Sequence, residues 1–474
     1  MDSLQQTLPD VIDKIGLGPA QAKVAILGGG IFFADGAEIL LISAVTQSVA
    51  SEWDLTKVQR ASVISLVFWG ILVGNIMSGP FGDFFGRKLP IMTSFLGVAL
   101  FSLASASARS LQFLSCARFF VGMSFGIGQP SYVAMAAEMT PSHWRTFVGT
   151  IAQIMFCFGE VYAAGLILYD DPTMTHLDWR WVLRMGAIPG CVFFVLSTVW
   201  LHQSPFFLSA AGRHQEAKAV LESMAVDNGV ADSISVEVTA SRREPSSEAL
   251  LAALARHARI IFSGEMWLSS LIVIYSCFVL NFVYYGSIYA IAQIIGDIGL
   301  QGAPAVELLI GAMFDIPGCI LGCVLCWLLP RKSVMKVYSA GMVIFLGLFV
   351  CFAKATNVVA TFFVTVGYYG MKMCPNIGFV AFYLYSSEIY PTDARATGTA
   401  LCFAGGRLAS ISAPLVYEAL TNVYDFRMYF VLMAGTCLLN GVLIEFLHLE
   451  TSNKQLSESV PQPSENNGRT YGAA

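Results

Sequence analysis

Two carboxylates interrupt the first long apolar stretch of the sequence. Asp35 and Glu38 lie within residues 24–49, a stretch longer than the roughly 20 residues that a membrane-spanning helix needs. Because the two acids are three residues apart, a helix would present both on one face. A charge in the middle of a bilayer costs at least ~2.5–3.5 kcal/mol unless it faces protein or water. We therefore expect this face to line an internal cavity, where Asp35 and Glu38 can take up and release a proton.

Five more ionisable residues lie deep in other apolar stretches. They are Arg118 in the fourth stretch, Glu160 in the fifth, Asp315 in the eighth, Lys372 in the tenth and Arg407 in the eleventh. The third, sixth, ninth and twelfth stretches carry no charge at depth. In a bundle built from triplets of helices, the first two members of each triplet would line a cavity and the third would face lipid. The distribution of charges follows that partition and predicts a polar path through the membrane.

Polar and aromatic side chains accompany these charges. The candidate solute-binding residues are Arg118, Gln153, Glu160, Asn281, Tyr284, Tyr285, Asp315, Lys372, Asn376 and Arg407. Amide and aromatic groups around a few charges suit a small polar organic solute. Lys372 and Arg407 can meet an anionic group, so we expect an organic anion or a zwitterion. A structural interpretation stays open for each residue: Tyr and Asn can hydrogen-bond between helices, and Arg118 can form an ion pair with Asp35 or Glu38.

The composition identifies the chain as a membrane protein and argues against other classes. Of its 474 residues 56% are hydrophobic and 12% are charged, whereas soluble domains have about 45–50% and ~25%. The eleven cysteines fall inside apolar stretches and are interpreted as packing residues rather than disulfides or metal ligands. The sequence has no phosphate-binding loop and no nucleophile with a nearby base. We expect no enzyme activity, no cofactor, no metal and no nucleic-acid partner.

The predicted fold is an all-α membrane protein with twelve transmembrane helices in two pseudo-symmetric six-helix bundles. The expected spans cover about residues 24–49, 61–79, 90–108, 111–137, 147–169, 181–201, 267–295, 305–328, 334–353, 358–385, 396–421 and 428–447. The expected domains are a leader (1–23), an N-terminal bundle (24–201), a linker with surface helices (202–265), a C-terminal bundle (266–450) and a disordered tail (451–474). Most Lys and Arg residues fall in segments on one side, which predicts that both termini are cytoplasmic.

An internal repeat supports the division into two bundles. Residues 138–145 (EMTPSHWR) follow the fourth span, and residues 388–395 (EIYPTDAR) follow the tenth. Glu, Pro and Arg keep the same spacing in both segments, at equivalent points of the two halves. Such a duplication predicts bundles related by pseudo-symmetry, with binding sites near the midplane between them.

Several motifs resemble those of the major facilitator superfamily. Residues 79–88 (GPFGDFFGRK), between the second and third spans, look like its signature loop. Residues 385–398 (YSSEIYPTDARATG) resemble the sugar-porter and organic-ion branches. Residues 15–21 (IGLGPAQ), 35–38 (DGAE) and 52–55 (EWDL) resemble the synaptic-vesicle-2-related and nicotinate-transporter-like group. The second copy of the signature loop is reduced to residues 330–332 (PRK).

The resemblance implies roles for the loop residues. In this superfamily such loops lock the cytoplasmic face when the cavity opens outward. The implied gating residues are Asp83, Arg87, Lys88, Glu138, Arg145, Glu388 and Arg395. The alternative is that these residues only decorate a membrane-surface turn or anchor the chain by the positive-inside rule.

The predicted function is secondary active transport of a small organic solute, of nicotinate- or sugar-like size, by alternating access with proton symport. One alternative is a proton-independent uniporter of an organic cation or sugar. Another is a receptor or regulator that keeps the fold without transport. We expect a monomer in the lipid bilayer, in the plasma membrane rather than in a vesicle membrane, with a proton as the coupling ion.

Overall fold

The computed structural model describes residues 8–231, 250–264, 266–298, 300–354, 357–390 and 394–447. The regular secondary structure of these residues is helical, and short turns and loops join the helices. The predicted tail (451–474) and part of the predicted linker (residues 232–249 and 265) lie outside the described residues.

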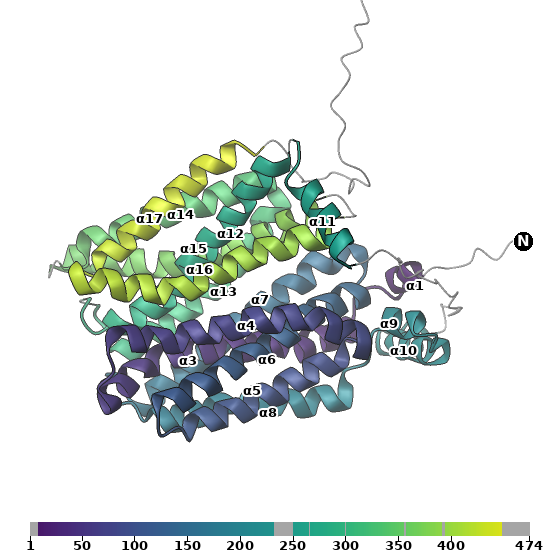
Figure 1. The fold of residues 1–474 in the computed structure, drawn as a ribbon, viewed down its shortest axis with the longest axis horizontal. Helices are drawn as coiled ribbons and strands as arrows, with labels where there is room; N and C mark the ends of the chain where they lie inside the picture. The colour runs from purple at the N-terminus through teal and green to yellow at the C-terminus, as the bar shows by residue number, and fades with distance from the viewer. Residues whose placement is uncertain are drawn as a thin grey trace, which may run out of the picture.

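Two groups of six long helices make up the body of the protein (Figure 1). The first group contains α3 (Gly29–Trp53), α4 (Lys57–Phe85), α5 (Lys88–Ala106), α6 (Leu111–Met139), α7 (Arg145–Asp170) and α8 (Trp179–Trp200). The second contains α12 (Met266–Ile294), α13 (Pro304–Leu328), α14 (Arg331–Phe352), α15 (Val358–Glu388), α16 (Arg395–Val423) and α17 (Arg427–Glu445). In Figure 1 the first group is purple to blue and lies below the second, which is green to yellow.

Eleven described helices are long and apolar enough to cross a membrane. The remaining expected span is α15, which has 31 residues but contains Lys372, Asn376 and several tyrosines that lower its hydropathy. The first span begins earlier than predicted, because α2 (Pro19–Lys23) and a π-helical turn (Val24–Gly28) continue directly into α3.

The two groups repeat the same packing pattern, which confirms the predicted pair of six-helix bundles. In the first group α3 packs on α7, α4 on α6, α5 on α6 and α5 on α8. The equivalent pairs in the second group are α12 with α16, α13 with α15, α14 with α15 and α14 with α17. The most extensive contacts between the bundles are those of α7 with α13, α4 with α16, and α3 with α12, and α7 also touches α15.

Glycine allows α3 and α7 to approach closely. A Cβ atom on Gly36 would lie 2.2 Å from the carbonyl oxygen of Phe156, and one on Gly159 would lie 2.0 Å from that of Phe33. No larger residue fits either position without moving a helix, as expected for small residues at helix crossings in membranes. The crossing holds Asp35 of α3 beside the helix that carries Glu160.

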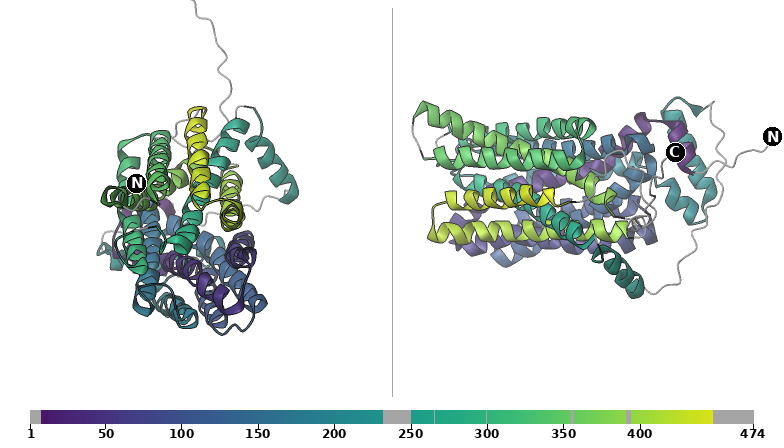
Figure 2. Two further views of the ribbon diagram at one scale, coloured as in Figure 1. Left: turned by 90° about the vertical axis from the view of Figure 1, so that its left-hand side faces the viewer. Right: turned by 90° about the horizontal axis from the view of Figure 1, so that it is seen from above.

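Shorter helices gather at one end of the bundles, which we call the inner end. They are α1 (Leu8–Ile15), α9 (Pro205–Ala210), α10 (His214–Asp227) and α11 (Leu250–Ile261). Figures 1 and 2 show them beyond the ends of the long helices. The Asn228 side chain holds the leader at this end, accepting from the Ala20 amide at 3.0 Å and donating to the Ile15 and Gly16 carbonyls at 3.3 and 3.2 Å. We call the opposite end the outer end.

Candidate functional site

The deep ionisable residues predicted from the sequence all lie inside the protein. Asp35, Glu38, Arg118, Glu160, Asp315 and Lys372 are buried, and Arg407 is half-buried. They form three groups: an ion pair within the first bundle and two clusters that join the bundles. Their partners show which charges are compensated.

Glu38 and Arg118 form the pair within the first bundle. Arg118 Nη1 lies 2.5 Å from Glu38 Oε2, and the Ser102 hydroxyl donates to Glu38 Oε1 at 2.5 Å. Arg118 Nε also donates to the Ser105 hydroxyl at 2.8 Å. Of the two possible partners of Arg118, the structure contains the pair with Glu38. The two charges compensate each other within the first bundle.

Asp35 and Arg407 are bridged by the side-chain amide of Gln129. Gln129 Nε2 donates to Asp35 Oδ2 at 2.7 Å, and Arg407 Nη2 donates to Gln129 Oε1 at 3.2 Å. The side-chain amide of Gln129 therefore hydrogen-bonds both an acid of its own bundle and a base of the other bundle. Within the described part of the chain, Asp35 Oδ1 and Arg407 Nη1 are buried without a hydrogen-bond partner. A buried polar atom without a partner is costly, and such atoms often mark a place for a ligand or water.

Glu160, Asp315 and Lys372 form the second cluster between the bundles. The Lys372 ammonium lies 3.1 Å from Glu160 Oε2 and 2.8 Å from Asp315 Oδ2. The Tyr284 hydroxyl donates to Glu160 Oε1 at 3.3 Å. Lys372 thus lies between two carboxyl groups, one from each bundle, and the cluster contains one more acid than base.

Asn376 extends this cluster toward α7. Its Nδ2 donates to Asp315 Oδ1 at 2.7 Å, and its Oδ1 accepts from Gln153 Nε2 at 3.3 Å. The predicted residues Gln153, Glu160, Tyr284, Asp315, Lys372 and Asn376 are therefore in one connected network. Asn281 is outside this network: its Nδ2 donates to the Cys277 carbonyl of its own helix at 2.9 Å.

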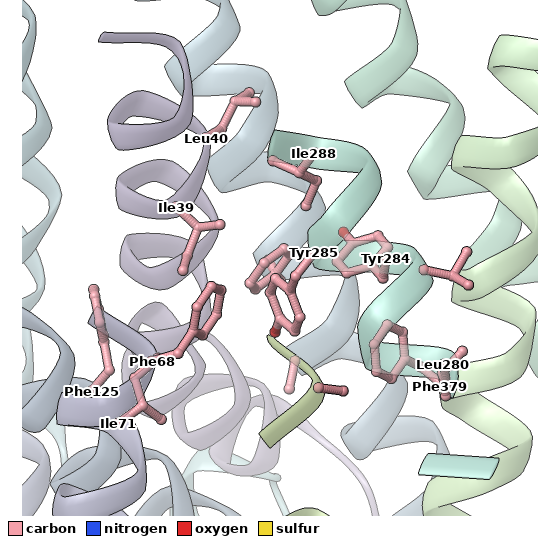
Figure 3. Packing of buried hydrophobic residues seen from close by; sticks show 14 of the residues in the cluster. Ile39, Leu40, Phe68, Ile71, Phe125, Leu280, Tyr284, Tyr285, Ile288 and Phe379 are labelled. Atoms are coloured by element: carbon pink, nitrogen blue, oxygen red, sulfur yellow. The ribbon is translucent and has the colours of Figure 1, made fainter. Parts of the chain in front are cut away.

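Aromatic rings fill the space between the two clusters. The Tyr285 ring lies 4.9 Å from the Phe68 ring and 5.3 Å from the Tyr284 ring, measured between centroids. Tyr284 in turn lies 5.2 Å from Phe379. Figure 3 shows the two tyrosines on α12 between Phe68 on one side and Phe379 on the other. Tyr285 also lies beside the Arg407 guanidinium.

The outer end is closed by contacts between the bundles. Arg60 Nε donates to Glu418 Oε1 at 2.9 Å, and the Tyr289 hydroxyl donates to the same oxygen. Further bonds join the Ser65 hydroxyl to the Ile411 carbonyl at 2.8 Å, and Gln293 Nε2 to the Ser43 carbonyl at 2.8 Å. At the loops, the Ala305 amide donates to the Pro172 carbonyl at 3.1 Å.

At the inner end the predicted gating residues pair within their own bundles. Arg87 bonds Asp83 at 3.0 Å and Glu138 at 3.3 Å, and Arg331 pairs with Glu388 at 3.7 Å. Although burial of the guanidinium opposes its charged form, Glu138 and Asp83 keep the pKa of Arg87 above its ordinary value. The equivalent positions of the two pairs match the internal repeat.

In the described part of the chain, Lys88 and Arg145 form no such ion pairs. Lys88 Nζ donates to the Thr198 carbonyl at 3.2 Å, and the Arg145 side chain is exposed. The side chain of Arg395 lies outside the described residues.

Sequence reasoning missed several residues of these networks, and periodicity could have found two of them. Gln129 follows Arg118 by eleven residues, and Glu418 follows Arg407 by the same interval. Eleven residues make about three helical turns, so each pair shares a face of its helix. Ser102, Ser105, Arg60 and Tyr289 carried no comparable signal.

Comparison with known families covers almost the whole chain. Residues 23–461 match the family described as sugar (and other) transporter. The synaptic vesicle 2-related protein of Xenopus laevis is 26% identical over 95% of this chain and 82% of its own length. Organic cation/carnitine transporter 7 of Arabidopsis thaliana is 24% identical over 97% of both chains.

Solved structures show the same fold. The proton:xylose symporter XylE bound to 6-bromo-6-deoxy-D-glucose superimposes with a TM-score of 0.67, at 18% identity over 93% of this chain and 97% of its own. A partially occluded inward-open conformation of the xylose transporter XylE from E. coli gives a TM-score of 0.70, covering 92% and 99% of the two chains. The chain is therefore a multi-pass membrane transporter of the major facilitator superfamily and belongs to its sugar (and other) transporter family.

Proposed function

We propose that this protein is a proton-coupled symporter of a small organic solute that carries an anionic group, either an anion or a zwitterion. One observation carries the proposal: Asp35 and Arg407, opposite charges from the two bundles, share the amide of Gln129, and each has a buried atom without a partner. Arg407 is the candidate site for the anionic group. Asp35 is the candidate site for the proton.

Charge compensation links the two binding events. With the site empty, Asp35 and Arg407 balance each other across Gln129. A carboxylate bound to Arg407 would take over its charge and leave Asp35 ionised and uncompensated in a buried place, which is strongly unfavourable. Binding of a proton to Asp35 removes that cost. By linkage, proton and anion then favour each other's binding, which is the requirement for symport.

The remaining charges support this assignment by elimination. Glu38 is compensated by Arg118, so we assign the coupling proton to Asp35 rather than to both acids. Lys372 is compensated by Glu160 and Asp315, so we assign it to the junction between the bundles. Arg118 Nη2 is also buried without a hydrogen-bond partner, but Arg118 is paired with Glu38. Among these deep bases of the described chain, Arg407 then remains as the one that reaches an acid only through Gln129.

Alternating access provides the transport step. The outer contacts around Arg60 and Glu418 hold that end closed. We propose that they separate when the carrier opens outward, while the inner loops meet and lock. The residues of that lock would be Asp83, Arg87, Lys88, Glu138, Arg145, Glu388 and Arg395.

We also propose the domain boundaries and the membrane topology that the sequence predicts. The inner end, with both termini, would face the cytoplasm of a cell whose plasma membrane holds the carrier as a monomer. The leader (1–23), the bundles (24–201 and 266–450), the linker (202–265) and the tail (451–474) would form the domains.

A second candidate is uniport of an organic cation. The unpaired oxygen of Asp35 and the rings of Phe68 and Tyr285 offer a carboxylate and aromatic faces, which together attract cations. A cation would take the place of the proton on Asp35, so no proton would accompany it.

Uptake into proteoliposomes separates these functions. A thermal-shift screen of monocarboxylates, nicotinate, sugars, amino acids and organic cations first identifies a solute, because ligand at 100 times its Kd stabilises by ~2.7 kcal/mol. Uptake of that solute is then measured with an inward proton gradient in the wild type and in Asp35→Asn. The matched control is the double variant Glu38→Gln/Arg118→Met, which removes a buried acid together with its own base. Loss of gradient-driven uptake in Asp35→Asn alone is expected; gradient-driven uptake by Asp35→Asn would refute the proposal.

A further inference from the structure

Two cysteines face each other across the junction of the bundles. Cys157 lies on α7 and Cys319 on α13, and their Sγ atoms are 3.6 Å apart. Both side chains are buried, and α7 and α13 form the most extensive contact between the bundles in the described part of the chain. The two thiols are far apart in the sequence, and each falls inside an apolar stretch, so the sequence alone did not indicate that they meet.

The pair belongs to the polar network between the bundles. Asn376 Oδ1 lies 3.6 Å from Cys319 Sγ and 4.0 Å from Cys157 Sγ. The same asparagine donates to Asp315, which holds Lys372. The thiols therefore lie beside the Glu160–Lys372 ion pair that joins the two bundles.

The separation of the thiols is small compared with the movement that bonding needs. A disulfide has an S–S distance of about 2.05 Å, so each sulfur must move by less than ~1 Å from its position here. Rotation about one side-chain torsion or a slight shift of a helix covers that distance. Helix pairs that exchange such contacts during a transport cycle sample shifts of this size.

We propose that Cys157 and Cys319 are a redox modification site at which a two-electron oxidant links the two bundles by a disulfide. With hydrogen peroxide, one thiol is oxidised to a sulfenic acid with release of water, and the second thiol displaces a second water as the S–S bond forms. With diamide, the two thiols give two electrons and two protons to the N=N bond, which becomes a hydrazine. Both reactions are reversed by an excess of dithiothreitol.

The bond would tie the bundles at the level of the ionic cluster. A disulfide keeps its two Cα atoms within about 6.8 Å, so motions that separate α7 from α13 beyond that distance at this level are blocked. Cysteines that share a helix cannot act in this way: Cys323 and Cys326 lie on α13 with Cys319 and connect nothing across the junction. The site is independent of the identity of the solute.

Cleavage of the linker makes the bond visible. A protease site is inserted between α10 and α11 in the full-length protein, reconstituted in liposomes and treated with diamide. After quenching of free thiols and cleavage, non-reducing electrophoresis should show the two halves as one band that dithiothreitol splits. Intact mass should fall by two hydrogen masses per molecule.

Single substitutions test the assignment. Cys157→Ser and Cys319→Ser should each abolish the linked band completely, whereas Cys277→Ser should keep it. Cys277 is the matched control because it is also a buried cysteine next to an asparagine, but within one bundle. The melting temperature of the uncleaved protein should rise with diamide in the wild type and not in Cys319→Ser, because a cross-link restricts the unfolded chain.

Two results would overturn the proposal. One is a pair of separate halves after diamide treatment, whether the thiols stay free or gain oxygen separately. The other is a linked band that persists in Cys157→Ser or Cys319→Ser, because a different pair of cysteines would then form the bond.

Discussion

Removing one member of the buried Glu38–Arg118 pair should destabilise the protein far more than removing both. Arg118→Met keeps the length of the side chain but leaves Glu38 with the Ser102 hydroxyl as its remaining partner in the structure. An uncompensated buried charge costs about 3–5 kcal/mol when its partner is removed. Glu38→Gln should also be costly, because Arg118 then keeps only neutral hydrogen-bond acceptors, such as the Ser105 hydroxyl, and loses its counter-ion. The double variant should lie close to the wild type, since replacing a whole buried pair is often neutral.

A double-mutant cycle gives the magnitude. Unfolding of the four proteins is followed by tryptophan fluorescence in mixed micelles with increasing denaturing detergent. If each single change costs about 3–5 kcal/mol and the double change costs about 1 kcal/mol or less, the coupling energy is at least roughly 5 kcal/mol. Double-mutant cycles of uncoupled sites differ from additivity by only about 0.3–0.5 kcal/mol.

The cycle also tests which acid carries the coupling proton. If the pair is structural, the double variant should fold and should retain gradient-driven uptake, whereas Asp35→Asn folds and loses it. Additive losses of stability in the double variant would contradict the buried pair. A stable double variant without proton coupling would mean that Glu38 does more than compensate Arg118.

Three further predictions concern the ends and the centre of the bundles. Arg60→Ala removes the base that holds Glu418, so the outer end should open more often. An impermeant maleimide should then label the double variant Ser65→Cys/Arg60→Ala several-fold faster than Ser65→Cys alone, and an unchanged rate would contradict the closure. Gln129→Met removes the bridge between Asp35 and Arg407 and should reduce the dependence of solute affinity on pH, measured as the change of Kd between neutral and acidic medium; an unaltered dependence would exclude the bridge as the coupling element. Asn228→Ala removes several bonds of the leader, worth about 0.5–1.5 kcal/mol each, and should speed limited proteolysis near Gly16. Equal cleavage rates would show that the other contacts of the leader hold it without Asn228.

The membrane-spanning helices could be predicted from the sequence because hydrophobic length and the cost of buried charge are local properties. The apolar stretches gave the spans, and the motif at residues 79–88 gave the superfamily. Several helices extend beyond the predicted spans, and the first begins earliest, since a π-helical turn at Val24–Gly28 joins it to α2 without a break. The second helix, Lys57–Phe85, exceeds its predicted span (61–79) at both ends. The same local reasoning identified which charges must be buried.

The partners of those charges could not be predicted, because they depend on the rotation of several helices about their axes. Asp35 and Glu38 share a face of α3, yet they are roughly 60° apart around the helix axis at 100° per residue. That angle is enough to direct Asp35 to Gln129 and Glu38 to Arg118. Counting the charged residues in each half of the sequence treats the two acids alike. In the structure, Glu38 directly contacts a counter-ion, Arg118, whereas Asp35 reaches Arg407 only through Gln129.

Lys372 illustrates the same limit. An isolated lysine in the tenth apolar stretch indicates a site for an anion. The structure surrounds it with Glu160 from one bundle and Asp315 from the other. Neither contact is visible in the sequence, because the three residues are distant in the chain and come together only when the bundles meet.

The number of protons that enter with each solute molecule tests the central claim most directly. Proteoliposomes in a weakly buffered medium are given the monocarboxylate identified by the thermal-shift screen, and external pH and solute uptake are recorded together. If the solute anion binds Arg407 and a proton neutralises Asp35, one proton enters with each monoanion. This uptake appears as external alkalinisation, which Asp35→Asn should abolish. Uptake without alkalinisation, or alkalinisation that persists in Asp35→Asn, would contradict the account.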